Sequence, residues 1–133
     1  MASRSEVEDT VLRRVQFTGQ PRGPSGGPVM AVNTAVAAAG SDNTDAGLIE
    51  QGGFTRVTGA DATKGVKLPD LEIGSMVVIK NNAAAILKIY GCAGSGINAG
   101  TVTTGAYSLA ASTVLVLIRE SATVWCTIPL VGS

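Results

Sequence analysis

Short apolar segments recur along most of this chain, and turn-forming residues separate them. In Leu87–Tyr90, apolar and mixed positions alternate with the period of two that is typical of a strand with one buried face. Met76–Lys80 and Thr113–Ile118 are almost continuously apolar, as in strands that are covered on both faces. The segments are rich in Val, Ile or Thr and predict strands: Val29–Val36, Phe54–Thr58, Gly65–Leu68, Ser75–Asn81, Leu87–Tyr90, Tyr107–Ala110, Thr113–Arg119 and Val124–Ile128.

This spacing of about eight strands predicts an all-β body over Val29–Ser133. We expect an antiparallel β-sandwich or a jelly-roll-like domain, because short strands separated by turn residues suit both architectures. Two doubly covered strands in so small a domain indicate either the centre of a sandwich or an oligomer interface. We therefore expect a homodimer or homotrimer whose interface includes Val114, Val116 and Leu117.

The N-terminal segment Ser3–Phe17 has a different pattern, with acidic residues first and basic residues last. That order suits the helix dipole and predicts a helix of about three turns. Such a short helix is marginal in water unless its apolar edge binds something. We expect it to bind a partner subunit through its apolar edge and two basic residues: Val7, Val11, Leu12, Arg13, Arg14, Val15 and Phe17. The alternative is a frayed terminus.

A linker, Thr18–Pro28, separates this segment from the body. Its three prolines and four glycines in eleven residues disfavour helix and strand. Fully extended, it would reach roughly 35 Å. Residues 1–28 are therefore expected to form an arm, either helical or extended, and residues 29–133 the β domain.

Composition adds limits on the partners. The chain has 133 residues, of which only 15% are charged, and ten basic residues balance ten acidic ones. Without a strong field or a basic surface interleaved with aromatics, nucleic acid and membranes are not expected as partners. The start of the chain, Met1–Gln16, is charged and lacks an apolar segment, so we expect no signal peptide.

Candidate catalytic residues are few. The chain contains no histidine, which removes the commonest general base and the commonest metal ligand. Cys92 lies in the glycine-rich run Gly91–Gly96, which lacks the lysine of a phosphate-binding loop and reads as a turn. We expect Cys92 and Cys126 to be buried small apolar side chains, and we expect no enzymatic activity.

Carboxylates form no recognisable metal or catalytic motif. Asp42, Asp45 and Glu50 lack the alternating order of a calcium-binding loop and indicate a solvated turn. Asp70 and Glu72 flank a loop after Pro69, and two carboxylates alone do not define a hydrolase site. No cofactor and no metal are expected.

A series of short motifs occurs in order along the body: Val32–Gly40, Phe54–Thr58, Gly65–Pro69, Val77–Asn82, Leu87–Tyr90, Gly96–Asn98 and Trp125. This series resembles a recurrent β-module of tailed-bacteriophage virion proteins, found in head decoration (cementing) proteins and in head or tail fibres. The family usually carries YPATG where this chain has Tyr90–Gly94 without the proline. The conformation of this turn therefore need not follow the family.

The resemblance implies a structural virion protein made in the host cytoplasm and located on the outer capsid surface. Its partners would be the major capsid protein, whose neighbouring subunits it would cement, and further copies of itself. The alternative within the same family is a fibre module that binds a host receptor or a glycan. The resemblance supplies no catalytic residues.

Overall fold

The structure, a computed structural model, describes residues 29–129, and these residues form ten strands and no helix. The all-β class is therefore confirmed for this part of the chain. The strands are β1 (Val32–Ala37), β2 (Gly47–Leu48), β3 (Gly53–Thr58), β4 (Gly65–Lys67), β5 (Met76–Asn81), β6 (Leu87–Tyr90), β7 (Gly96–Ile97), β8 (Ala106–Leu109), β9 (Val114–Arg119) and β10 (Val124–Ile128).

All eight predicted strands are present, most of them within a residue of the predicted bounds. The largest difference is at β1, which begins at Val32 and not at Val29. The sequence pattern missed β2 and β7, which have two residues each. Neither is long enough to show an alternation of apolar and polar positions, and each begins with a glycine.

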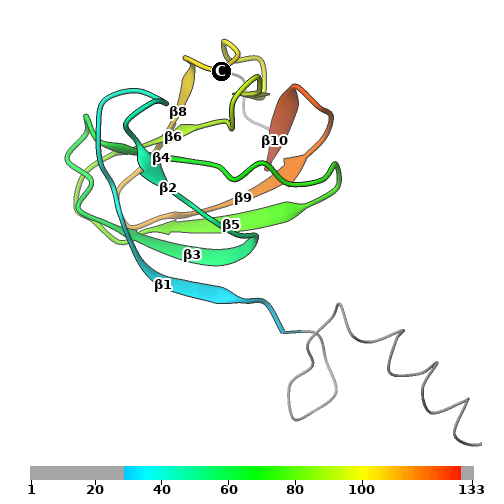
Figure 1. Ribbon diagram of the computed structural model, residues 1–133. Helices are drawn as coiled ribbons and strands as arrows, with labels where there is room; N and C mark the ends of the chain where they lie inside the picture. The colour runs from blue at the N-terminus through cyan, green and yellow to red at the C-terminus, as the bar shows by residue number, and fades with distance from the viewer. Residues whose placement is uncertain (1–28, 130–133) are drawn as a thin grey trace, which may run out of the picture. The chain divides into compact units, whose positions relative to one another are not determined.

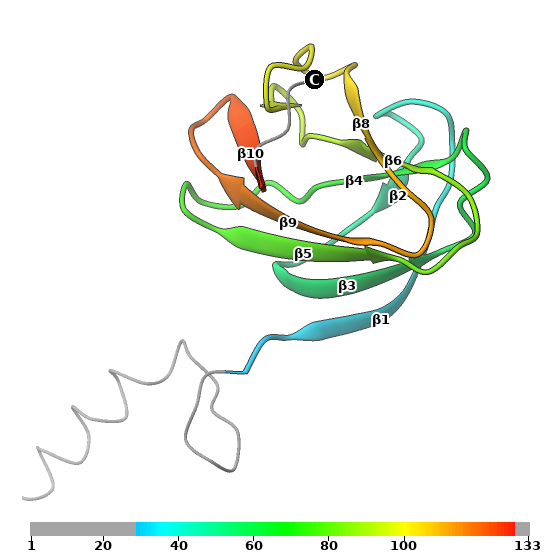
Figure 2. The same ribbon diagram turned by 180° about the vertical axis from the view of Figure 1, so that it is seen from behind.

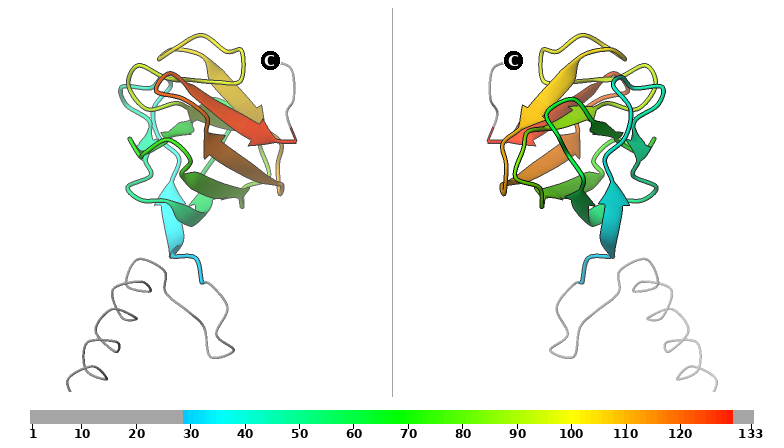
Figure 3. Two further views of the ribbon diagram at one scale, coloured as in Figure 1. Left: turned by 90° about the vertical axis from the view of Figure 1, so that its right-hand side faces the viewer. Right: turned by 90° about the vertical axis from the view of Figure 1, so that its left-hand side faces the viewer.

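The strands form two sheets that lie in two layers (Figures 1 and 3). One sheet has six strands in the order β1-β3-β5-β9-β10-β7, and the other has four in the order β2-β4-β6-β8. Figure 2 shows the larger sheet from behind, with β9 between β5 and β10.

The chain passes from one sheet to the other at almost every connection. β1, β3 and β5 belong to the larger sheet, while β2, β4 and β6 belong to the smaller one. Consecutive strands within each of these sets therefore run in the same direction and pair in parallel. The prediction of antiparallel sheets is wrong, because the turn segments between strands carry the chain across to the other layer and do not close hairpins.

The C-terminal strands add antiparallel pairs to both sheets, and β10 also pairs in parallel with β7 at the edge of the larger sheet. β8 pairs with β6, while β9 pairs with β5 and with β10. Both sheets are consequently mixed, and a jelly-roll-like topology is not confirmed. The predicted arm, residues 1–28, lies outside the described residues.

A single apolar core occupies the space between the two layers. Its side chains come from the inward positions of both sheets, and alternation along β5 and β9 is regular because every second residue faces this core. Trp125 on β10 is its largest fully buried side chain. The other fully buried apolar residues are Ile49, Val57, Val66, Leu68, Val77, Ile79, Leu87, Ile89 and Leu117.

Candidate interaction face

The outward side of the six-stranded sheet carries mostly apolar side chains. Register places one row across five strands, in which each residue lies opposite the next: Val32, Phe54, Val78, Val116 and Ile128. A second row joins Met76, Ile118 and Cys126. We call the apolar face the outward set Val32, Phe54, Met76, Val78, Val114, Val116, Ile118, Val124, Cys126 and Ile128.

No described residue forms a layer over this apolar face. Val32, Val114 and Ile128 retain 55%, 53% and 50% of their accessible surface, and Met76 is also exposed. The central residues Val78 and Val116 are only partly buried, as expected where neighbours on the same sheet are the main cover. A contiguous apolar surface of this kind is typical of a site of interaction.

The three predicted interface residues divide between this face and the core. Val114 and Val116 point outward on β9, so both are available to a partner. Leu117 is fully buried and faces the inside of the domain, because alternate residues of a strand point to opposite sides. Leu117 is therefore a core residue and does not belong to the face.

Charged residues border the apolar face at both ends. Arg56 and Lys80 lie directly opposite each other on β3 and β5, beside Val114. Neither forms an ion pair with any residue in the described part of the chain. Glu120, which is exposed, follows β9 at the other end, where its backbone N–H donates to the Val124 carbonyl at 2.9 Å.

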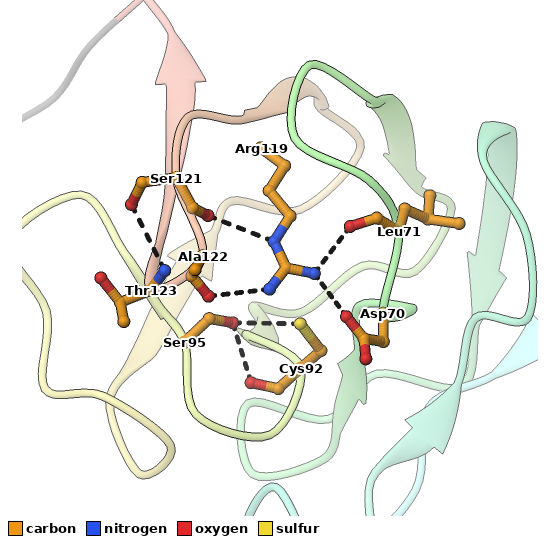
Figure 4. A network of polar contacts seen from close by, with 8 residues as sticks. All are labelled: Asp70, Leu71, Cys92, Ser95, Arg119, Ser121, Ala122 and Thr123. Carbon is orange, nitrogen blue, oxygen red and sulfur yellow. Dashed lines mark hydrogen bonds and ion pairs between the residues drawn. The ribbon is translucent and has the colours of Figure 1, made fainter.

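Arg119, the last residue of β9, points away from the apolar face into a polar network (Figure 4). Its guanidinium donates to the Asp70 carboxylate at 2.6 Å and to the Leu71 carbonyl at 2.8 Å. It also donates to the carbonyls of Ala122 at 2.8 Å and Ser121 at 3.2 Å. The network joins the loop before β5 to the β9–β10 hairpin, and so holds the end of the face that carries Glu120.

The indole of Trp125 lies beneath this guanidinium, whose central carbon is 5.8 Å from the ring centroid. Such stacking adds a cation–π attraction to the hydrogen bonds. The indole N–H of Trp125 has no hydrogen-bond partner among residues 29–129. Trp125 therefore acts in the core mainly through its apolar area and its contact with Arg119.

The acidic loop before β2 is a self-contained turn. Asp45 accepts hydrogen bonds from the backbone N–H groups of Ser41 and Asp42, and Asp42 accepts from the N–H and hydroxyl of Thr44. The bonds from Thr44 lower the pKa of the Asp42 carboxyl. These contacts agree with the predicted turn, and among the described residues no three His, Cys, Asp or Glu side chains group to hold a metal ion.

The glycine-rich run after β6 is also a turn. The Ser95 hydroxyl donates to the Cys92 carbonyl at 2.8 Å and lies 3.2 Å from the Cys92 sulfur, as Figure 4 shows. Cys92 is buried, as predicted, whereas Cys126 is only partly buried and lies on the apolar face. A partly accessible thiol in this position is a natural reporter for anything that covers the face.

Sequence reasoning missed Arg119 as a central residue. A single arginine at the end of an apolar strand forms no recognisable motif. Its partners are three carbonyl oxygens and the carboxylate of Asp70, which is far away in the sequence. The predicted arm residues Val7, Val11, Leu12, Arg13, Arg14, Val15 and Phe17 lie outside the described residues.

Comparison of the chain with protein-family models, with curated proteins and with solved structures finds no match in any of the three. Within residues 29–129, no helix is long and apolar enough to cross a membrane.

Proposed function

We propose that this chain is a structural virion protein of a tailed bacteriophage, which binds the outer surface of the capsid and cements neighbouring major capsid subunits. The observation that carries the proposal is the apolar face of the six-stranded sheet, which suits a subunit that is built into an assembly. The motif series that resembles decoration proteins supplies the capsid as the partner. The sandwich-like body and the N-terminal arm that the sequence predicts belong to this proposal.

The composition supports a role in assembly and not in catalysis. The whole chain lacks histidine, and its net charge of zero is a solubility liability for a free monomer. The liability is smaller for a subunit that soon becomes part of a shell. A protein that binds only the assembled shell stabilises it, since binding shifts the equilibrium toward the bound form.

The test uses heads of the encoding phage that lack this protein. Purified full-length chain should bind such heads in a saturable manner and raise the temperature at which they release DNA. Sedimentation of heads with bound chain measures the first effect, and dye access to DNA during heating measures the second. Absence of binding would contradict the proposal, and binding to host cells in its place would favour the fibre alternative.

A further inference from the structure

We propose that two copies of the chain pair through their apolar faces, with the strands of one sheet running opposite to those of the other. The partner is a second copy. The two-fold axis lies between the two sheets, parallel to their planes and perpendicular to the strands. The inference goes beyond the proposed function and does not depend on the capsid; it concerns the homo-oligomer that the sequence predicts. It rests on how charge and apolar surface are distributed over one sheet.

The two ends of the face have opposite charge. Arg56 and Lys80 occupy one end, and Glu120 occupies the other, about 20 Å away along β9. If the second sheet lies face to face with its strands reversed, the basic end of each copy lies over the acidic end of its partner. With strands running the same way, like charges would meet at both ends, and like-charge contacts disfavour an interface.

The middle of the face suits such a contact. On reversal, the row through Val78 and Val116 lies over the partner's row through Met76 and Ile118. Both rows are apolar, so no buried polar group is left without a hydrogen bond. An apolar centre with a charged rim is the usual anatomy of a protein interface.

The size of the face is also appropriate. Five strands about 4.8 Å apart, each about six residues long, occupy roughly 24 by 20 Å in plan. Side chains that project from this plane raise the accessible area toward the approximately 800 Å² that each partner contributes to a standard interface. Packed sheets lie about 10 Å apart, which allows side chains from both faces to interdigitate.

Charge reversal tests the orientation. We expect Lys80→Glu alone and Glu120→Lys alone each to weaken dimerisation of the full-length chain about tenfold, because each places like charges together at both symmetric contacts. The double variant K80E/E120K restores opposite charges and should bring the dissociation constant back to within about threefold of the unaltered protein. Sedimentation equilibrium at low salt measures all four proteins. Unchanged single variants, or a double variant no tighter than the single ones, would overturn the proposal.

The native thiol tests proximity without a destabilising change. In the proposed pair Cys126 lies one residue, or half a row, from the axis, so the strands that carry the two symmetric thiols are about 12 Å apart and the side chains point toward each other. A short bis-maleimide should therefore link two copies covalently, and Cys126→Ser should abolish the product, since Cys92 is buried. Val116→Lys should give a folded monomer, with circular dichroism as the control for folding.

These measurements separate the inference from the proposed function. A protein that stays monomeric at high concentration and gives no cross-linked dimer would overturn the pairing while leaving capsid binding intact. A face that is instead covered by the capsid would show protection of Cys126 from maleimide only when heads are present, and this result would also overturn the pairing. Paired copies that fail to bind heads would contradict the proposed function alone.

Discussion

Arg119 shows how one side chain joins two segments that are far apart in sequence. Its charge is buried, yet its only carboxylate partner, Asp70, has a side chain that is 85% exposed. Most of the compensation therefore comes from the carbonyls of Leu71, Ser121 and Ala122. Guanidinium is suited to this role, because its planar set of N–H donors reaches several acceptors at once.

Replacing Arg119 should be far more costly than replacing its ionic partner. We expect Arg119→Met to lower the free energy of unfolding by about 3 kcal/mol, since several buried carbonyls lose their donors together. Asp70→Ala should cost less than about 1 kcal/mol, because the Asp70 carboxylate is exposed and water screens its attraction for the guanidinium. Urea denaturation of both variants measures the difference. Equal losses would mean that the ion pair, and not the set of carbonyls, stabilises the network.

Tyr90 links the stability of the fold to alkaline pH. Its hydroxyl donates to the Ser41 carbonyl at 2.9 Å, and burial, followed by the charges of Asp42 and Asp45, raises its pKa. The phenol is therefore harder to ionise in the folded than in the unfolded chain. Its contribution to stability is complete below the unfolded pKa of about 10 and is lost as the pH rises through the folded pKa.

Thermal denaturation between about pH 9 and pH 11 tests this dependence. We expect the melting temperature of the unaltered protein to fall more steeply over this range than that of Tyr90→Phe, which has no phenol to ionise. Tyr107→Phe is the matched control and should keep the steep fall. Parallel curves for all three proteins would show that Tyr90 is not the group responsible.

At the scale of the element, Asn81 fixes the end of β5 against two turns. Its side-chain amide donates to the carbonyls of Ala85, Leu109 and Ala110 at 2.8, 3.2 and 3.1 Å. Its side-chain oxygen accepts from the N–H of Ala83 at 3.1 Å. This fully buried amide therefore satisfies backbone groups at the end of β8 and in the turns that follow β5 and β8.

We expect Asn81→Asp to lower the free energy of unfolding by about 3 kcal/mol at neutral pH, because a buried carboxylate would face three carbonyl oxygens. The loss should shrink toward pH 4, since a protonated acid can again donate a hydrogen bond. Asn82→Asp is the matched control, because Asn82 is exposed, and it should change stability by less than about 0.5 kcal/mol. Chemical denaturation at the two pH values gives both results. A loss that does not depend on pH would point to altered packing and not to charge.

The elements themselves could be predicted largely from local pattern, whereas their pairing could not. The alternation of Val77 and Ile79 with exposed or partly buried neighbours is the local pattern that predicts β5. Nothing in that alternation says whether the next strand lies in the same sheet or the opposite one. The close approach of paired strands is equally invisible in that alternation: a Cβ on Gly65 would lie 2.6 Å from the Lys88 carbonyl oxygen, so glycine permits β4 and β6 to pair within the smaller sheet.

For the same reason, only part of the apolar face could be predicted from the sequence. The unbroken apolar runs of β5 and β9 predicted an interface that includes Val114 and Val116. The row from Val32 to Ile128 needs strand order and register across five strands, which are long-range properties of the fold. A run that is apolar on both sides does not reveal which residue faces inward, so the pattern alone places the buried Leu117 in the interface.

At the scale of the whole molecule, the described residues 31–129 belong to one compact unit. Because the chain alternates between the two layers, one side of the six-stranded sheet is buried and apolar side chains on the other side stay exposed. Under our proposal, this face joins copies of the protein, and capsid binding then requires a second surface. The arm predicted over Ser3–Phe17 is the candidate, because its apolar edge is too short to hold a helix without a partner.

A chain beginning at Val29 tests this division of roles. We expect it to keep its thermal stability and its self-association, because both belong to the compact unit. Its affinity for heads that lack the protein should fall at least about tenfold, a loss of about 1.4 kcal/mol. The full-length double variant Val11→Asp, Val15→Asp should lose capsid affinity to a similar extent, since charges would interrupt the apolar edge while the length of the arm stays the same. Head binding that is undiminished in both proteins would rule out the arm as the capsid-binding element, and loss of folding on truncation would place it in the core.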